Sequence, residues 1–251
     1  MKAVVFRAIE EVEVEDVDEP RVETANDVVV EVEAAGLCGS DLHPYYGREV
    51  GLDPGTVMGH EFVGRVVEVG TGVRTLSGGD RVVAPFTTSC GYCLACSEGL
   101  TARCERGQLF GWVQDGAGLH GGQAARVRVP LADGTLVRVP EGMDAALALL
   151  AGDILSTALF GCTMADVGAG SRVAVVGWGP VGLMTIRAAF SLGSENVYAV
   201  DRVARRLEGA VALGALSLHL EDDRAWAIRR HGGRGEEAVI EAVGGAGATR
   251  T

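Results

Sequence analysis

The first half of the chain carries short valine-rich runs in which apolar and polar residues partly alternate. Runs of about four to eight residues rich in β-branched side chains predict strands, and the glycines between them are typical of tight turns. The acidic run over residues 10–19 alternates with valine and predicts a strand with a solvated face. The other strands are expected over residues 28–32, 62–69, 81–84 and 124–129.

The second half has a different pattern, in which compact apolar runs alternate with stretches of helical spacing. Strands that alternate with helices predict a parallel sheet with right-handed crossovers. The boundary is expected near Gly152, which gives a β-rich domain over residues 1–152 and an α/β domain over residues 153–251. In the second domain we expect strands over residues 173–176, 196–200 and 238–242, and helices over residues 181–192 and 203–213.

Composition and charge narrow the range of partners. The 251 residues are 47% hydrophobic, enough for a sizeable core, and the formal net charge of −12 makes nucleic acid a poor partner. Residues 1–18 turn acidic at once and lack the apolar centre of a signal peptide. The longest apolar stretch, residues 145–155, is interrupted by Asp153 and is shorter than a membrane span. We therefore expect a cytoplasmic protein without a membrane partner, where clustered cysteines favour metal over disulfides.

Four cysteines are closely spaced in one segment. Two, two and seven residues separate them, and thiolates two residues apart can face one metal across a tight turn. A closed set of four thiolates is typical of structural zinc, although an iron–sulfur cluster and disulfide-bonded or free cysteines are alternatives. The sequence favours zinc, held by Cys90, Cys93, Cys96 and Cys104.

A second set of metal-ligating residue types lies earlier in the chain. Cys38 follows a Gly-Leu pair, and His60 and Glu61 follow a glycine. A cysteine, a histidine and a carboxylate form a three-ligand site with an open fourth position, as catalytic zinc requires. Taken singly, a lone cysteine or histidine is more often structural.

The segment after the strand expected at 173–176 has the pattern G-x-G-x-x-G. It opens a helix, and Asp201 ends the next strand, which is the context of a dinucleotide fingerprint. The glycines allow a tight turn, approach of the pyrophosphate and helix–strand packing, while the helix N-terminus attracts phosphate. Asp201 would bind ribose hydroxyls and repel a 2′-phosphate, which favours NAD over NADP, a preference that Arg202 weakens. The motif residues are Gly177, Gly179, Pro180, Val181 and Gly182.

Together these motifs resemble the zinc-dependent medium-chain dehydrogenase family, the alcohol dehydrogenase type, over essentially the whole chain. The resemblance implies a GroES-like β-rich catalytic domain followed by a Rossmann domain. It implies a catalytic zinc held by Cys38, His60 and Asp153, with Glu61 near the metal and Asp41 orienting His60. An aspartate at position 153 is similar to the formaldehyde-dehydrogenase-like branch.

The resemblance also implies a reaction path. Ser40 and His43 match a proton relay that runs through the cofactor ribose, and Thr157 matches a residue packed against the nicotinamide. The implied reaction is hydride transfer between a small alcohol or aldehyde and NAD(H), with two zinc ions in each chain. Cys162 is expected to be a buried apolar residue, and His120, His219 and His231 are expected to be structural or exposed.

Members of this family usually continue beyond this length. The resemblance implies that two further strands, which complete the nicotinamide pocket and the usual dimer or tetramer contact, are missing after Thr251. The fourth strand would then be an open sheet edge. The alternative function is therefore a non-catalytic, zinc-binding remnant of this fold.

Overall fold

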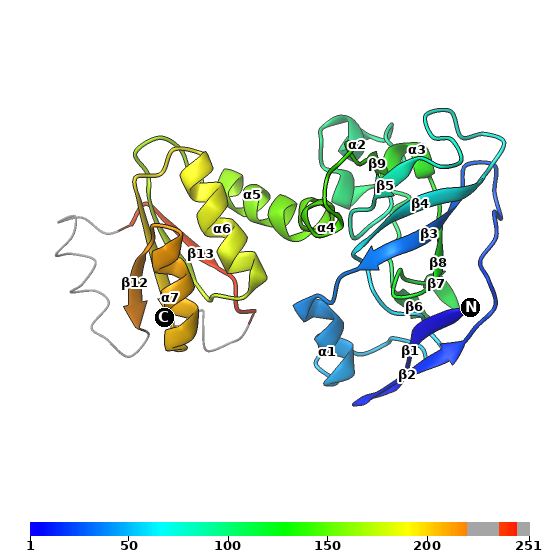
Figure 1. The fold of residues 1–251 in the computed structure, drawn as a ribbon, viewed down its shortest axis with the longest axis horizontal. Helices are drawn as coiled ribbons and strands as arrows, with labels where there is room; N and C mark the ends of the chain where they lie inside the picture. The colour runs from blue at the N-terminus through cyan, green and yellow to red at the C-terminus, as the bar shows by residue number, and fades with distance from the viewer. Residues whose placement is uncertain (220–235, 245–251) are drawn as a thin grey trace. The chain divides into compact units, whose positions relative to one another are not determined.

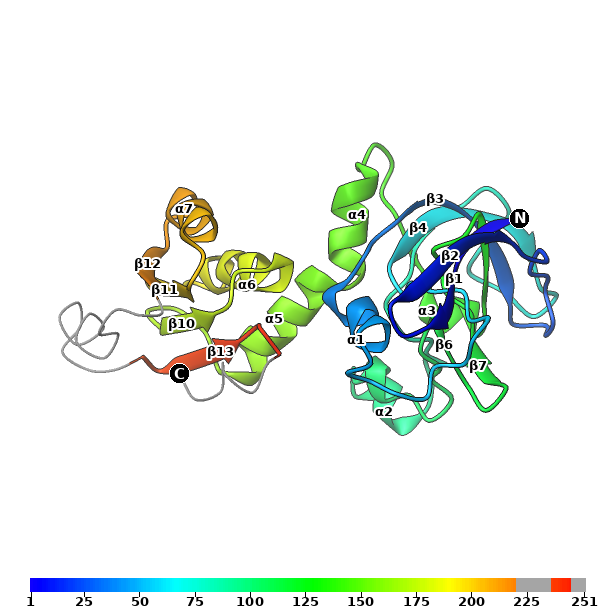
Figure 2. The same cartoon turned by 90° about the horizontal axis from the view of Figure 1, so that it is seen from below.

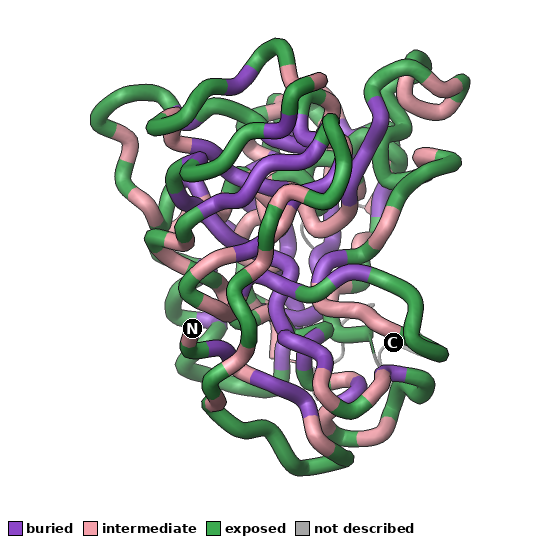
Figure 3. Tube along the Cα trace, turned by 90° about the vertical axis from the view of Figure 1, so that its right-hand side faces the viewer, coloured by how far each residue is buried: buried purple, intermediate pink, exposed green. Residues whose placement is uncertain are grey.

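The computed structural model describes residues 1–219 and 236–244, so His231 lies outside the described residues. The chain divides into two compact units, Met1–Asp153 and Ile154–Thr251 (Figure 1). The division falls one residue after the boundary expected from the sequence. In each unit buried positions gather along the strands, and the connecting loops are mostly exposed (Figure 3).

A five-stranded antiparallel sheet forms the centre of the first unit. Its order is β8-β3-β4-β5-β9, so strands distant in sequence, such as β3 and β8, are neighbours (Figure 1), and β3 and β4 lie side by side (Figure 2). The core on this sheet includes Val30, Phe62 and Val127, each at most 2% exposed. The four strands predicted in this region are confirmed, with ends that differ by a few residues. The bounds are β3 (Val28–Ala35), β4 (Phe62–Val69), β5 (Arg81–Val83), β8 (Arg126–Val129) and β9 (Val137–Arg138).

Two small hairpins and several short helices complete this unit. The hairpins pair β1 with β2 and β6 with β7. In the acidic run, Val12 and Val14 are 40% and 69% exposed, so this strand has no buried face. Among the described strands it pairs only with β1. The bounds are β1 (Lys2–Ala8), β2 (Glu11–Asp16), β6 (Trp112–Gln114), β7 (Ala117–Leu119), η1 (Gly39–Asp41), α1 (Leu42–Tyr45), α2 (Leu94–Ser97), η2 (Thr101–Arg103) and α3 (Ala132–Thr135).

The second unit contains the parallel sheet that the alternating pattern predicted. Its order is β12-β11-β10-β13, and each neighbouring pair is parallel. Helix α6 connects β10 to β11, and α7 connects β11 to β12, so the chain crosses the sheet in one direction. Right-handed connections therefore place both helices on the same face of the sheet. The bounds are β10 (Arg172–Val176), α6 (Pro180–Ser191), β11 (Asn196–Asp201), α7 (Ala204–Ala212), β12 (Leu216–His219) and β13 (Ala238–Glu241).

One apolar segment is longer than the sequence suggested. By length and composition alone, the segment Ala145–Met164 could cross a membrane. Of its apolar 18-residue stretch, 17% is buried inside the protein. The structure divides it at Asp153 into α4 (Ala145–Gly152) and α5 (Ile154–Met164). Ala148 packs into a small core of the first unit, and the predicted buried Cys162 packs into the core of the second. The estimate of a stretch ending near residue 155 was wrong, because the helical pattern continues through the polar residues of α5.

Candidate metal centres and dinucleotide site

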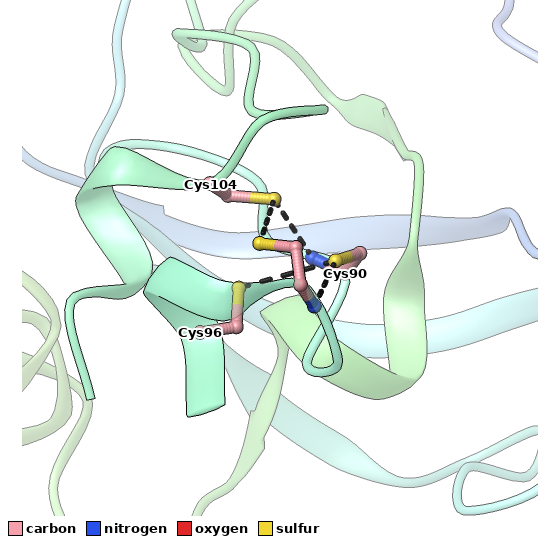
Figure 4. Close-up of side chains that lie close together, drawn as sticks. Cys90, Cys96 and Cys104 are labelled. Atoms are coloured by element: carbon pink, nitrogen blue, oxygen red, sulfur yellow. Dashed lines mark hydrogen bonds between the residues drawn. The ribbon is translucent and has the colours of Figure 1, made fainter. Parts of the chain in front are cut away.

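The four cysteines of residues 90–104, the cysteine lobe, face one point (Figure 4). Their sulfur atoms all lie within 4.8 Å of one another, and two pairs are 4.0 Å apart. Sulfur ligands of a tetrahedral zinc lie about 3.8 Å apart, given Zn–S bonds of about 2.3 Å. A disulfide would need about 2.05 Å, and all four cysteines are free. The spacing therefore fits a closed metal site and excludes paired cysteines.

Backbone N–H groups in the cysteine lobe point at the sulfurs. Cys90 N–H donates to Cys104 Sγ at 3.2 Å, and Cys93 N–H donates to Cys90 Sγ at 3.3 Å. Backbone N–H groups of Cys96 and Glu105 lower the pKa of Cys93 to about 6, whereas burial raises the pKa of Cys96 to about 11. Hydrogen bonds of this kind stabilise thiolates, the form that binds metal.

Four residues from three distant segments meet in the first unit and are called the mixed cluster: Cys38, His60, Glu61 and Asp153. One ligand atom from each lies within 4.8 Å of all the others. His60 Nε2 and Asp153 Oδ2 are 3.4 Å apart. Nitrogen and oxygen ligands of a tetrahedral zinc are also about 3.4 Å apart, given bonds of about 2.1 Å. The donor set and its spacing therefore fit zinc.

Local sequence explains how Cys38 and His60 are oriented. Cys38 N–H donates to Asp41 Oδ2 at 2.9 Å, and Asp41 N–H donates to the Cys38 carbonyl at 3.2 Å, which starts η1. The other Asp41 oxygen, Oδ1, lies 3.2 Å from His60 Nδ1. This contact fixes the ring so that Nε2 faces the cluster. Gly36 lies against Glu61, since a Cβ there would be 2.0 Å from Glu61 Oε2.

The mixed cluster favours positive charge. Burial lowers the pKa of His60, but hydrogen bonds with Asp153, Asp41 and Cys38 outweigh it and raise the pKa to about 12. Burial raises the pKa of Glu61, and the neighbouring Asp153 carboxylate adds to the increase. Anionic groups held together out of water need a counter-charge. A divalent cation supplies one and suits this donor set.

The two candidate relay residues lie next to the mixed cluster on neighbouring short helices. Ser40 is exposed on η1, and its Oγ lies 3.3 Å from His60 Nε2. His43 is half-buried on α1. Ser40 is therefore at the metal cluster itself, and the half-buried His43 lies three residues further along the chain.

The glycine motif forms the turn between β10 and α6. Gly177 has φ +95°, a conformation that favours glycine, and a Cβ at Gly182 would be 2.0 Å from the Gly177 carbonyl oxygen. Among the described residues, no atom lies within 4 Å of a Cβ at Gly179, so this position is open. Gly179 caps the helix and Pro180 occupies its first turn, which leaves the N–H of Val181 directed outward. This arrangement suits a phosphate.

Asp201 ends β11 beside this turn and is 7% exposed. Trp178 N–H donates to its Oδ2 at 2.9 Å, and Val203 N–H donates to its Oδ1 at 2.8 Å. The carboxylate is therefore rigidly held. Arg202 is exposed beside it, and Thr157 is exposed on α5.

Comparison with known proteins identifies the family to which the chain belongs. Residues 24–141 match the alcohol dehydrogenase GroES-like domain. A medium-chain reductase/dehydrogenase from an Acremonium species is 44% identical, and the match covers 100% of this chain and 88% of that protein. A zinc-type alcohol dehydrogenase B from Aspergillus flavus is 42% identical over all of this chain, which spans 60% of that relative.

Solved structures give the same result for the fold. An alcohol dehydrogenase from a Thermus species superposes with a TM-score of 0.94 and 42% identity. The superposition covers 100% of this chain and 72% of the Thermus chain. The GroES-like and partial Rossmann architecture expected from the sequence is therefore confirmed.

Proposed function

Since the chain belongs to the zinc-dependent medium-chain dehydrogenase/reductase family, we propose that it oxidises an alcohol, or reduces the matching carbonyl, with NAD(H). The observation that carries this proposal is the mixed cluster, whose Cys38, His60 and Asp153 present a thiolate, an imidazole and a carboxylate within 4.8 Å. Three protein ligands leave a fourth position for a substrate oxygen. The cysteine lobe would hold a second, structural zinc.

The chemistry divides between bound groups and side chains. Zinc in the mixed cluster would supply a Lewis acid that acidifies a hydroxyl, and the nicotinamide would supply the hydride acceptor. Asp41 holds the His60 ring through Nδ1 at 3.2 Å, so that Nε2 faces the other ligands of the cluster. Ser40 would take up the substrate hydroxyl proton as it gives up its own, and that proton would leave to solvent through His43. Glu61 contributes a second carboxylate to the cluster.

We propose NAD as the preferred cofactor because Asp201 is fixed where the adenosine ribose would bind. Replacing Asp201 by serine removes the negative charge that repels a 2′-phosphate, while the hydroxyl still accepts a backbone hydrogen bond. The preference for NADH over NADPH, measured as a ratio of Kd values, is expected to fall about 30-fold, the equivalent of about 2 kcal/mol. Glu208→Gln on α7 removes an exposed charge nearby and should leave the ratio unchanged. An unaltered ratio in the Asp201→Ser variant would argue against this role.

The proposed activity is tested with purified, zinc-loaded protein and a panel of alcohols and aldehydes. NAD-linked turnover of at least one substrate is the expected result. Titration with NADH distinguishes the proposal from a zinc-binding protein of this fold without activity. The proposal expects saturable NADH binding at the glycine motif, whereas the alternative expects zinc with neither turnover nor ordered nicotinamide.

A further inference from the structure

The side chain of Gln123 lies between the segments that carry the candidate zinc ligands. It is half-buried at the start of the segment that leads into β8. The amide Nε2 donates to the Gly36 carbonyl oxygen at 3.1 Å and to Asp41 Oδ2 at 3.2 Å. Both hydrogens of the amide are therefore directed at the segment that holds Cys38.

The backbone of Gln123 is bonded to the other segment, the one that leads into His60. Gln123 N–H donates to the Met58 carbonyl at 2.9 Å, and the preceding residue, Gly122, donates to the Gly59 carbonyl at 2.9 Å. Gly59 has φ +93°, and a Cβ there would lie 2.4 Å from Gln123 Cγ. These close contacts leave little freedom for the position of Gln123 relative to His60.

We propose that Gln123 is a positioning residue that sets how the Cys38 and His60 segments meet, and that it acts through Asp41. Asp41 Oδ2 accepts from both Cys38 N–H, at 2.9 Å, and Gln123 Nε2, at 3.2 Å. Two donors on one oxygen fix the rotation of the carboxylate and leave Oδ1 for His60 Nδ1. The orientation of the imidazole toward the metal position thus depends on an amide outside the ligand set.

The inference rests on the proposed zinc site. A methionine substitution at position 123 separates the hydrogen-bonding role of Gln123 from its packing. Gln123→Met keeps the length and most of the volume of the side chain but removes the donor. Gln108→Met is the matched control, because Gln108 is also half-buried in the same unit and, among the described residues, its amide reaches only the Gly118 carbonyl, at 3.5 Å. Gln123→Asn, which keeps an amide too short to reach both acceptors, is a second variant.

The experiment titrates zinc-free full-length protein with Co²⁺ and then displaces the metal with a chelator. One thiolate and four thiolates give different Co²⁺ absorption spectra, so the two sites are followed separately. In Gln123→Met and Gln123→Asn, affinity at the mixed cluster is expected to fall about 10-fold with a shifted spectrum. The cysteine lobe, an internal measure of folding, and the Gln108→Met control should match the wild type.

Three results would overturn the inference, and they are distinguishable. If the mixed cluster of both Gln123 variants binds Co²⁺ with the affinity and spectrum of the wild type, the positioning role alone is overturned. Wild-type protein that binds no metal at the mixed cluster overturns the proposed function, and this inference with it. Equal losses at the mixed cluster and the cysteine lobe would also contradict it, because they indicate a general folding defect.

Discussion

Replacing Cys38 by alanine is expected to lower kcat/KM for NAD-linked alcohol oxidation by about 1000-fold. Cys38 supplies the only thiolate among the mixed-cluster residues. Without Cys38, zinc would be lost or displaced. The enzyme would then lose the several kcal/mol by which a metal stabilises developing charge on a substrate oxygen. A loss of about 4 kcal/mol corresponds to about three orders of magnitude in rate.

The control for this variant is another cysteine. Cys162 is fully buried in the second unit, where its thiol donates to the Thr185 carbonyl at 3.7 Å. Cys162→Ala should cost some stability and keep kcat/KM within a few-fold of the wild type. Comparable turnover in Cys38→Ala and Cys162→Ala would mean that Cys38 does not hold a catalytic metal.

The second large effect is expected on stability, from Cys93→Ser in the cysteine lobe. Structural zinc contributes about 10 to 16 kcal/mol in isolated zinc-binding peptides. Even a third of that amount lowers the Tm of a protein of this size by about 10 °C. We therefore expect a fall of at least about 10 °C in calorimetry, with protease cleavage appearing first between Cys90 and Cys104.

Ser97→Ala is the matched variant, because Ser97 lies on α2 in the same lobe and its hydroxyl donates only to the Leu94 carbonyl, at 2.8 Å. Its Tm should change by about 1 °C or less. A Cys93→Ser protein that melts with the wild type and retains the same zinc content would show that the lobe is stable without the metal.

The sequence predicted those parts of the sites whose residues lie within one short stretch of the chain. The four cysteines lie within one short segment, so their spacing alone indicates a common metal. The glycine motif and Asp201 likewise lie within one short unit, in which β10, a turn, α6 and β11 follow one another along the chain. The mixed cluster is different, because Cys38, His60 and Asp153 come from separate segments that only the folded unit brings together. Asp153 could be assigned only through the family resemblance.

Features that depend on distant contacts were missed. Strand β1 was not predicted; it pairs with β2 with a register shift between Phe6 and Ala8, and Val4 N–H donates to the distant Gln123 carbonyl at 2.8 Å. The segment Ala145–Met164 was read as a shorter apolar run, because the polar residues of α5 interrupt the apolar pattern while the helix continues. Gln123 carries no local signal, since its significance comes from contacts with residues far away in sequence.

The central claim is that the mixed cluster and the cysteine lobe are two separate zinc sites. The most direct measurement is the zinc content of purified wild-type, Cys38→Ala and Cys93→Ser proteins, determined by elemental analysis together with the X-ray absorption edge of the bound metal. We predict two zinc ions in the wild type and one in Cys38→Ala, with the remaining ion surrounded by sulfur alone. A wild-type protein with a single, all-sulfur zinc that Cys38→Ala leaves unchanged would contradict the account.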